Sequence, residues 1–139
     1  MNNQQKIVIV EDNQGDLELI KLALDLKKVQ RELVHLADGQ KALDYFRGLE
    51  YQQKPRLIIL DLNLPRINGK EVLHFIKSQP LLKSIPVVVL SSSNLEQDIV
   101  DVYSLNANCF ISKPIDLDDF ISAIQSIDEF WFRTAAIPG

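Results

Sequence analysis

The sequence is poor in cysteine, glycine and proline, and it has no long hydrophobic segment. Its 139 residues include 1 cysteine, 5 glycines and 6 prolines. The single Cys109 excludes an internal disulfide framework, and so little glycine and proline excludes a low-complexity chain. No apolar stretch approaches the about 20 residues that cross a bilayer, so a membrane partner is not expected. Because Met1 is followed by polar residues rather than by a signal segment, we expect a cytoplasmic location.

The sequence also lacks a run of basic residues. It has 15 Lys and Arg against 19 Asp and Glu, a net charge of −4, so a nucleic-acid partner is not expected. The charge is uneven along the chain. Residues 1–93 carry 13 basic and 11 acidic side chains, whereas residues 94–139 carry 2 and 8. The last third therefore predicts an acidic surface.

Short runs rich in β-branched residues alternate with amphipathic stretches. Each run is almost continuously apolar, which is typical of strands buried on both faces. The runs are 7–10, 33–36, 57–60, 87–90 and 109–111. A helical pattern with apolar residues three and four apart follows each of them. Five strand–helix units predict one α/β domain, a doubly wound parallel sheet of five strands with helices on both faces.

Two helix starts can also be predicted from the sequence. Ser93 and Glu96 form a capping-box pattern at the start of the fourth helix. Asp116 and Asp118 favour the start of the fifth helix, because acidic side chains interact well with the positive end of a helix. The apolar face of this fifth helix extends from about residue 116 to 131.

Polar residues collect where the predicted strands end. Glu11 and Asp12 follow the first strand, Asp61 follows the third, Ser91 the fourth and Lys113 the fifth. Ligands bind at this edge of an open α/β sheet. Neighbouring carboxylates repel one another, and a hard cation such as Mg²⁺ relieves that repulsion. A carboxylate beside the cation can attack a phosphoryl donor and form an aspartyl phosphate, while a lysine and a hydroxyl bind the phosphoryl oxygens.

Each of these residues has a simpler explanation when it is taken alone. An acidic pair after a strand is usually a solvated loop, and a single aspartate is usually a helix cap. A lone lysine is usually on the surface, and serines often cap helices. The joint placement of three acids, a hydroxyl and a lysine at one edge of one sheet favours a site, with Asp61 best placed to be the nucleophile.

These residues, in this order, resemble the receiver domain of bacterial two-component response regulators, and the resemblance extends from Lys6 to about Trp131. It implies a flavodoxin-like fold with five helices and strand order 2-1-3-4-5. It also implies the roles of several residues. Glu11 and Asp12 would hold Mg²⁺, Asp61 would be the phosphoacceptor and a further ligand, and Asn63 would bind the metal through its backbone carbonyl.

The same resemblance implies roles for residues after the later strands. Ser91 would be the switch hydroxyl and Lys113 the phosphate-binding lysine, followed by Pro114 in a bond that is often cis in the family. Pro65 and Gly69 would shape the acceptor loop. Family members often carry an aromatic switch residue three positions before the lysine. Here that residue is Phe110, which is either a switch or simply a packing residue of the fifth strand.

The C-terminal part is similar to the stand-alone regulators of bacterial and cyanobacterial phytochrome histidine kinases, through residues 108–113 and 127–132. This similarity implies a phytochrome-like kinase partner and a homodimer formed by the fourth helix, fifth strand, fifth helix and tail. Three consecutive aromatic residues at a helix end cannot all be buried against one sheet. A partner must cover some of them, or residues 133–139 must fold back over them. The residues expected on this output and dimer face are Ile99, Tyr103, Phe120, Phe130, Trp131 and Phe132.

The resulting prediction is a single-domain response regulator, with a receiver at 1–131 and an extension at 132–139 too short for an output domain. It would accept phosphate from a sensor histidine kinase and signal through altered protein contacts, without being an enzyme. The alternative is a scaffold of the same fold that binds regardless of phosphorylation. An aspartate-based phosphatase would need an acid at Asn63. A flavodoxin-like electron carrier would need a Ser/Thr/Gly-rich loop at 11–13, and there is no nucleotide-binding glycine loop.

Overall fold

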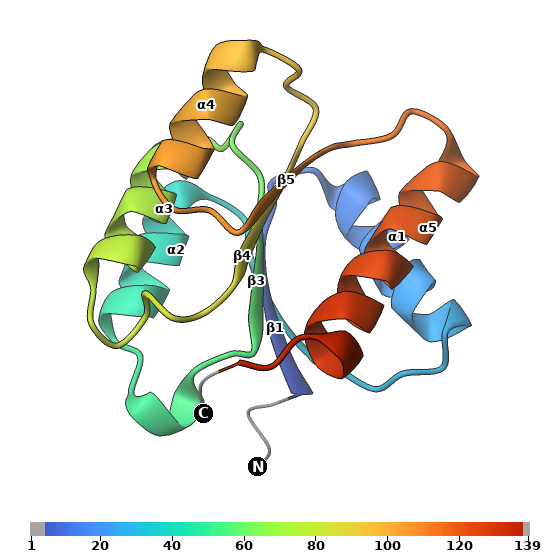
Figure 1. Ribbon diagram of the computed structural model, residues 1–139, viewed down its shortest axis with the longest axis horizontal. Coiled ribbons are helices and arrows are strands. Elements are labelled where there is room, and N and C mark those ends of the chain that lie inside the picture. The colour runs from blue at the N-terminus through green and yellow to red at the C-terminus, as the bar shows by residue number, and fades with distance from the viewer. Residues whose placement is uncertain (1–4, 138–139) are drawn as a thin grey trace.

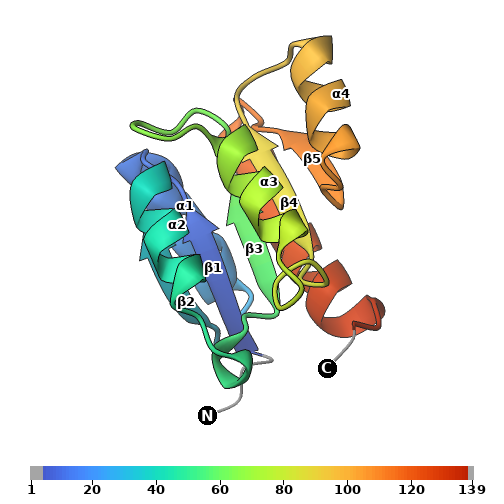
Figure 2. The same ribbon diagram turned by 90° about the vertical axis from the view of Figure 1, so that its left-hand side faces the viewer.

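The computed structural model describes residues 5–137, and over these residues five parallel strands form one sheet in the order β2-β1-β3-β4-β5. Figure 2 shows the sheet with its strands side by side. The strands are β1 (Lys6–Val10), β2 (Glu32–Leu36), β3 (Leu57–Leu60), β4 (Val87–Ser91) and β5 (Cys109–Ser112). The helices are α1 (Gln14–Leu26), α2 (Gly39–Arg47), α3 (Gly69–Ser78), α4 (Glu96–Ser104) and α5 (Leu117–Glu129). The predicted fold, including its strand order, is confirmed.

The helices cover both faces of the sheet. Figure 1 shows α1 and α5 on one side and α2, α3 and α4 on the other. Because successive side chains of a strand point to opposite faces, each central strand contributes to two separate cores. The core beneath α2, α3 and α4 takes Val8, Val10, Ile58, Leu60, Val87 and Val89. The core beneath α1 and α5 takes Ile7, Ile9, Leu57, Ile59, Val88 and Leu90.

The two edge strands differ from the sequence prediction. Every residue of β1, β3 and β4 is buried, as expected for strands covered on both faces. No residue of β2 or β5 is fully buried, and Glu32, His35 and Ser112 are exposed. The prediction of complete burial is wrong for these two strands because each lies at an edge of the sheet and has a neighbouring strand on one side only.

Side-chain caps begin four of the five helices in the described part of the chain. The capping residues are Asn13, Asp38, Asn68 and Asp116. The exception is α4, which begins after Leu95 without a side-chain cap. The predicted capping box is therefore wrong: the Ser93 hydroxyl donates a hydrogen bond to Asp98 within α4. Ser93 thus connects the loop after β4 to the first turn of α4 without acting as its N-cap.

The chain after α5 continues as a π-helical segment, Phe130–Thr134. This segment lies against the rest of the protein rather than extending away from it. Arg56 Nε donates to the carbonyl of Trp131 at 3.1 Å, and Arg31 lies 4.0 Å from the ring centroid of Phe132. The predicted boundary at residue 131 is not marked by a break in packing, and residues 138 and 139 of the predicted extension lie outside the described chain.

Within residues 5–137, no helix combines the length and the apolar character needed to span a membrane.

Candidate functional site

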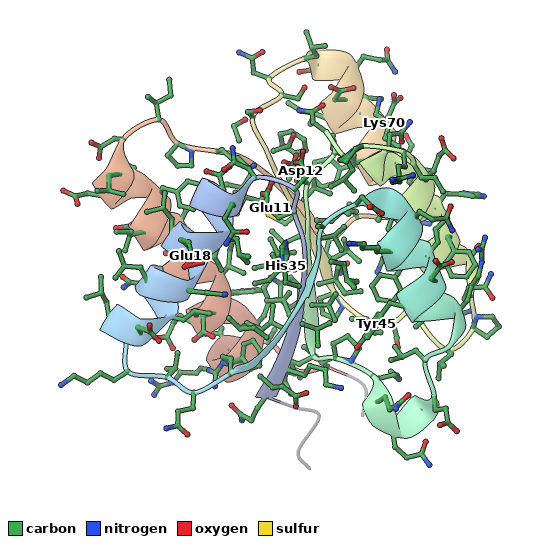
Figure 3. All side chains as sticks on the ribbon, turned by 180° about the vertical axis from the view of Figure 1, so that it is seen from behind. Glu11, Asp12, Glu18, His35, Tyr45 and Lys70 are labelled. Carbon is green, nitrogen blue, oxygen red and sulfur yellow. The ribbon has the colours of Figure 1, made fainter. Side chains whose placement is uncertain are left out.

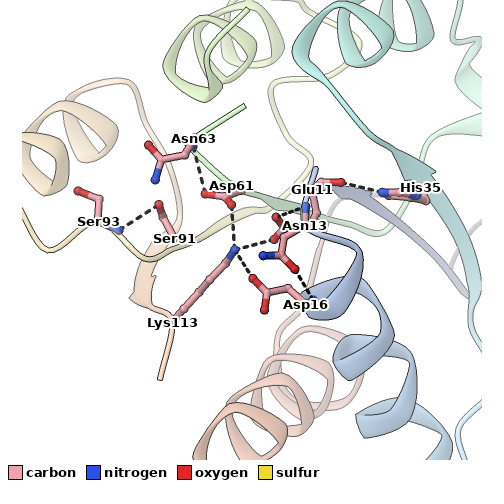
Figure 4. Close-up of polar contacts among 9 residues, drawn as sticks. All are labelled: Glu11, Asn13, Asp16, His35, Asp61, Asn63, Ser91, Ser93 and Lys113. Atoms are coloured by element: carbon pink, nitrogen blue, oxygen red, sulfur yellow. Dashed lines mark hydrogen bonds and ion pairs between the residues drawn. The ribbon is translucent and has the colours of Figure 1, made fainter. Parts of the chain in front are cut away.

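The carboxyl ends of β1, β3 and β5 bring acidic and basic side chains together (Figure 4). Glu11 and Asp61 are 2% and 4% exposed, whereas Asp12 faces solvent. Figure 3 shows Glu11 and Asp12 next to each other where β1 ends. Carboxylate oxygens of Glu11, Asp12 and Asp61 lie within 4.8 Å of one another. The structure therefore brings together the three predicted acids.

Lys113 places its ammonium group among these carboxylates. Its Nζ lies 2.8 Å from Glu11 Oε1, 2.8 Å from Asp61 Oδ2 and 2.7 Å from Asp16 Oδ2. The lysine side chain is only 9% exposed. An ammonium group has three N–H donors, and each of them has a carboxylate acceptor here.

The electrostatics of the site reflect burial and ion pairing together. Burial raises the pKa of Glu11 to about 7, against the opposing effect of its hydrogen bond to Lys113. Burial alone would lower the pKa of Lys113, but the hydrogen bonds to Asp16, Asp61 and Glu11 outweigh it and hold that pKa above its ordinary value. The lysine therefore stays charged, and the site contains more negative than positive charge.

The loop after β3 fixes the position of Asp61. The backbone N–H of Asn63 donates to Asp61 Oδ1 at 3.1 Å, and the N–H of Gly69 donates to the carbonyl of Leu62 at 2.9 Å. A Cβ on Gly69 would lie 2.3 Å from the carbonyl oxygen of Asp61. Only glycine allows α3 to begin so close to the predicted acceptor.

Pro65 belongs to a contact between this loop and the start of α2. Its carbonyl accepts hydrogen bonds from the N–H groups of Gly39 at 3.4 Å and Ile67 at 2.9 Å. A Cβ on Gly39 would lie 1.8 Å from the carbonyl oxygen of Ile67. Gly39 looks like an ordinary turn residue in the sequence, but it lets α2 press against the acceptor loop.

Ser91 is the last residue of β4, and Pro114 follows the end of β5. Ser91 is fully buried, and its Oγ accepts a hydrogen bond from the N–H of Ser93 at 3.3 Å. The backbone N–H of Lys113 donates to the carbonyl of Ser91 at 2.8 Å, which joins the two loops. No peptide bond between residues 5 and 137 is cis. The Lys113–Pro114 bond is therefore trans, and not the cis bond that the family resemblance suggested.

Phe110 is half-buried and packs against the core beneath α2, α3 and α4. Its backbone N–H donates to the Tyr103 hydroxyl at 3.0 Å, so β5 and α4 are linked at this residue. This packing agrees with the simpler explanation of Phe110. The switch role of Phe110 stays a prediction.

The predicted output and dimer face needs a correction. Phe120 is 3% exposed and lies in the core beneath α1 and α5, because its position on α5 turns it toward the sheet. Trp131 and Phe132 are partly buried against the same core. Tyr103 and Phe130 remain about half exposed, at 48% and 49%. The π-helical segment thus turns two of the three consecutive aromatic residues toward the protein itself, in agreement with a tail that folds back.

The acidic excess of residues 94–139 is reduced by ion pairs with the rest of the chain. Asp98 and Asp101 pair with Lys70 on α3 at 2.6 and 2.8 Å. Asp128 is buried against Arg31 at 2.8 Å. The surface of this region is therefore less acidic than the residue count alone predicts.

Asp16 and His35 contact the site although the sequence did not mark them. Asp16 lies in the first turn of α1, where its N–H donates to Asn13 Oδ1 at 2.9 Å and its carboxylate binds Lys113. His35 on β2 has its Nε2 2.7 Å from the backbone carbonyl oxygen of Glu11. The spacing of Asp16 from Asp12 indicates only a helix start, since the partner of Asp16 lies at the far end of the chain.

The donor set fits a divalent cation. Glu11, Asp12 and Asp61 offer carboxylate oxygens from two adjacent strand ends, and oxygen is the ligand that hard divalent cations prefer. Asp12 and Asp61 line a pocket together with Asn63, Ser92 and Lys113. The polar groups of these last three residues suit an anion beside the cation.

Comparison with known proteins agrees with this geometry. The family model for the response regulator receiver domain matches residues 7–125. Response regulator Rcp1 of Synechocystis is 41% identical over 99% of this chain and 95% of its own length.

Two solved structures are similar over nearly the whole fold. The phosphorylated cyanobacterial phytochrome response regulator RcpA is 46% identical and has a TM-score of 0.90, covering 97% of this chain and 99% of its own. The Mn²⁺-bound form of Rcp1 is 38% identical and has a TM-score of 0.89 over the same shares. With the fold, the acidic cluster and the buried lysine in place, the chain belongs to the response regulator receiver domain family.

Proposed function

We propose that Asp61 accepts a phosphoryl group from a phosphohistidine of a sensor histidine kinase. The observation that supports this most is the buried Asp61 carboxylate, which lies 2.8 Å from the Lys113 ammonium group and next to two further carboxylates. The protein acts as a phosphoacceptor rather than as an enzyme that turns over a separate substrate. We also propose a cytoplasmic location.

The chemical step is a displacement at phosphorus. A carboxylate oxygen of Asp61 forms a bond to phosphorus as the bond to the histidine nitrogen breaks, and the electron pair of that bond returns to the imidazole. The product is an acyl phosphate on Asp61. Lys113 is already hydrogen-bonded to Asp61 Oδ2 and can pair with the oxygens of the transferred group.

Mg²⁺ is the cation we propose for the acidic cluster. Glu11, Asp12 and Asp61 would hold it, together with the backbone carbonyl of Asn63. When bound, it neutralises charge on the phosphoryl group. The proposal is supported by the oxygen-only donor set and by the Mn²⁺-bound form of the similar protein Rcp1.

Phosphorylation would be passed on through the loop after β4. If the Ser91 hydroxyl turns to a phosphoryl oxygen, the N–H of Ser93 loses the acceptor that it has in this structure. Ser93 is also bonded to Asp98 within α4, so a shift of Ser91 reaches that helix. We therefore infer that α4 and β5, which Tyr103 and Phe110 join, form the surface whose contacts change.

We propose that the partner kinase is of the phytochrome type and that the protein forms a homodimer through the α4–β5–α5 face. The similarity to RcpA and Rcp1 over the whole fold supports the kinase class. Partly exposed apolar side chains on that face support self-association, and Ile99, Tyr103 and Phe130 are the expected contacts that remain accessible. The buried Phe120 is not one of them.

The test is incubation with Mg²⁺ and a small acyl-phosphate donor, followed by intact-mass measurement. The wild-type protein should gain the mass of one phosphoryl group, and Asp61→Asn should gain none. Chelation of the metal should abolish the gain. Absence of a gain in the wild-type protein, or a gain that survives Asp61→Asn, would overturn the proposal and favour a phosphorylation-independent scaffold.

A further inference from the structure

Lys113 has three carboxylate partners, and only two of them belong to the proposed metal site. Glu11 and Asp61 are shared between the lysine and the cation cluster. Asp16 contacts Lys113 at 2.7 Å but is not a member of that cluster. Figure 4 shows Asp16 reaching the lysine from the start of α1, on the side away from Asn63.

A cation held by Glu11 and Asp61 would bind two carboxylates that Lys113 contacts in this structure, and would weaken the interaction of the lysine with both. The lysine is 9% exposed, so an ammonium group that lost both of these carboxylates could not simply become hydrated. It would need another charged acceptor within reach. Asp16 is such an acceptor, and its side chain is 23% exposed. Because Asp16 is not part of the proposed metal site, a cation bound there leaves its carboxylate available to the lysine.

The backbone holds Asp16 in this position. Its N–H donates to the side chain of Asn13, the residue that caps α1, at 2.9 Å. The first turn of α1 is therefore fixed relative to β1, and packing of α1 against α5 places it beside the loop that carries Lys113. Two contacts of α1 therefore hold Asp16 next to the lysine: the Asn13 cap and the packing against α5.

We propose that Asp16 is a positioning residue that keeps the Lys113 ammonium group beside Asp61 when a divalent cation takes over the carboxylates of Glu11 and Asp61. This inference rests on the proposed metal-dependent function. Asp16 keeps Lys113 hydrogen-bonded and close to the oxygens of an incoming phosphoryl group. Asp16 also raises the affinity of the site for the cation, because the displaced lysine retains one carboxylate partner.

A different role would be a direct electrostatic attraction between Asp16 and the cation. The two roles are separated by a double-mutant cycle, because an effect that operates through Lys113 disappears when the lysine is removed. Mg²⁺ affinity is measured by calorimetry for the wild-type protein, Asp16→Asn, Lys113→Met and the double variant. The matched control is Glu18→Gln, which removes the same charge from an exposed part of α1 outside the acidic cluster (Figure 3).

We expect Asp16→Asn to weaken Mg²⁺ binding about fivefold in the wild-type background and less than about twofold in the Lys113→Met background. Glu18→Gln should change the affinity less than about twofold, and Asp16→Glu should restore part of the loss. Equal weakening in both backgrounds would overturn the positioning role, as would no weakening at all. Failure of the wild-type protein to bind Mg²⁺ would overturn the proposed function, and the role of Asp16 with it.

A second readout keeps the inference testable if Lys113→Met does not fold. An amine-selective reagent is applied with and without Mg²⁺, and labelling of Lys113 is measured by peptide mass spectrometry. Mg²⁺ should raise the labelling of Lys113 about threefold or more in Asp16→Asn, where the released lysine has no charged partner, and leave it nearly unchanged in the wild-type protein. An equal increase in both proteins would contradict the inference.

Discussion

The two ends of the sheet each hold a partly buried lysine, and the two lysines have opposite electrostatic surroundings. At the carboxyl end, Lys113 has three carboxylate partners. At the opposite end, and among residues 5–137, Lys77 of α3 donates only to oxygens that carry no charge: the carbonyls of Lys83 at 3.0 Å and Ile85 at 2.8 Å, and Asn108 Oδ1 at 3.1 Å. Both ammonium groups are satisfied, but only one is paired with opposite charge.

The pKa values of the two lysines move in opposite directions for this reason. Burial lowers the pKa of Lys77 to about 8, because no carboxylate compensates for the lost water. The carboxylates around Lys113 outweigh its burial and raise its pKa above the ordinary value. Burial alone therefore does not mark a functional lysine. The surplus of carboxylates around it does, because that surplus is costly unless a cation or a reaction uses it.

The largest effect is expected when the charge at the carboxyl end is removed. Lys113→Met leaves the carboxylates of Glu11, Asp16 and Asp61 without their counter-ion, and should lower the free energy of unfolding by about 3 kcal/mol near pH 8 in the presence of a chelator. Chemical denaturation measures this change. Lys21→Met, which removes an exposed lysine paired at 3.7 Å, is the control and should cost less than about 0.5 kcal/mol.

The loss in Lys113→Met should become smaller near about pH 5.5, because protonation relieves the repulsion between the remaining carboxylates. The pKa of Glu11 is already raised to about 7 by burial, and it rises further without the lysine. An equal loss at both pH values would show that the lysine stabilises the protein by packing rather than by charge.

The next largest effect concerns the amino end. The folded pKa of Lys77, about 8, lies below its ordinary value of 10.5. The unfolded chain therefore binds more protons between these two values, and the free energy of unfolding of the wild-type protein rises with pH in that range. Lys77→Met has no proton to release, so this rise should be lost.

The free energies of unfolding of the two proteins should therefore diverge by about 1 kcal/mol over this pH range. A full pKa shift would contribute about 1.4 kcal/mol per unit, but the side chain keeps some contact with water, which reduces the effect. It is measured as the wild-type free energy of unfolding minus that of Lys77→Met, at several pH values from 7.5 to 10. Parallel pH profiles for the two proteins would mean that Lys77 has an ordinary pKa.

The smallest effect is expected when a carboxylate is placed next to Lys77, which makes the amino end of the sheet resemble the carboxyl end. Asn108→Asp replaces one of the neutral acceptors of Lys77 by a carboxylate of nearly the same shape. It should raise the pKa of Lys77 by about half a unit, since an opposite charge within hydrogen-bonding distance favours the ammonium form and water screens part of that charge. Nuclear magnetic resonance titration of the lysine side chain measures this pKa, with Asn94→Asp in the exposed loop after β4 as the control. No shift would show that water screens the new charge.

The same two ends show what a sequence can predict. Asp61 follows a buried apolar run directly, so local order alone places it at the sheet edge with Glu11 and Asp12. Asp16 and Lys77 were missed because their partners are distant in sequence or belong to the backbone: Lys113 is 97 residues from Asp16, and two of the three acceptors of Lys77 are carbonyls. Residue types carry no signal for such contacts.

The fold predictions that were wrong also have identifiable physical causes. The short apolar run of β5 looks as buried as β4, since the edge position of a strand is set by topology and not by composition. Phe120 is buried because it lies on the face of α5 that packs on the sheet. Trp131 and Phe132 turn toward the protein because the π-helical segment from Phe130 changes the helical period. Ser93 fits a capping pattern, yet its hydroxyl donates to the side chain of Asp98 in the first turn of α4 instead of capping the helix.

We infer that the carboxyl end of the sheet responds to phosphorylation while the amino end is structural. Amide hydrogen exchange, followed by mass spectrometry with Mg²⁺ and with or without an acyl-phosphate donor, tests it most directly. Exchange should change in 91–95 and 110–115, stay the same in the loop 79–86 that surrounds Lys77, and show no change anywhere in Asp61→Asn. Equal changes at both ends, or changes that persist in Asp61→Asn, would contradict the account.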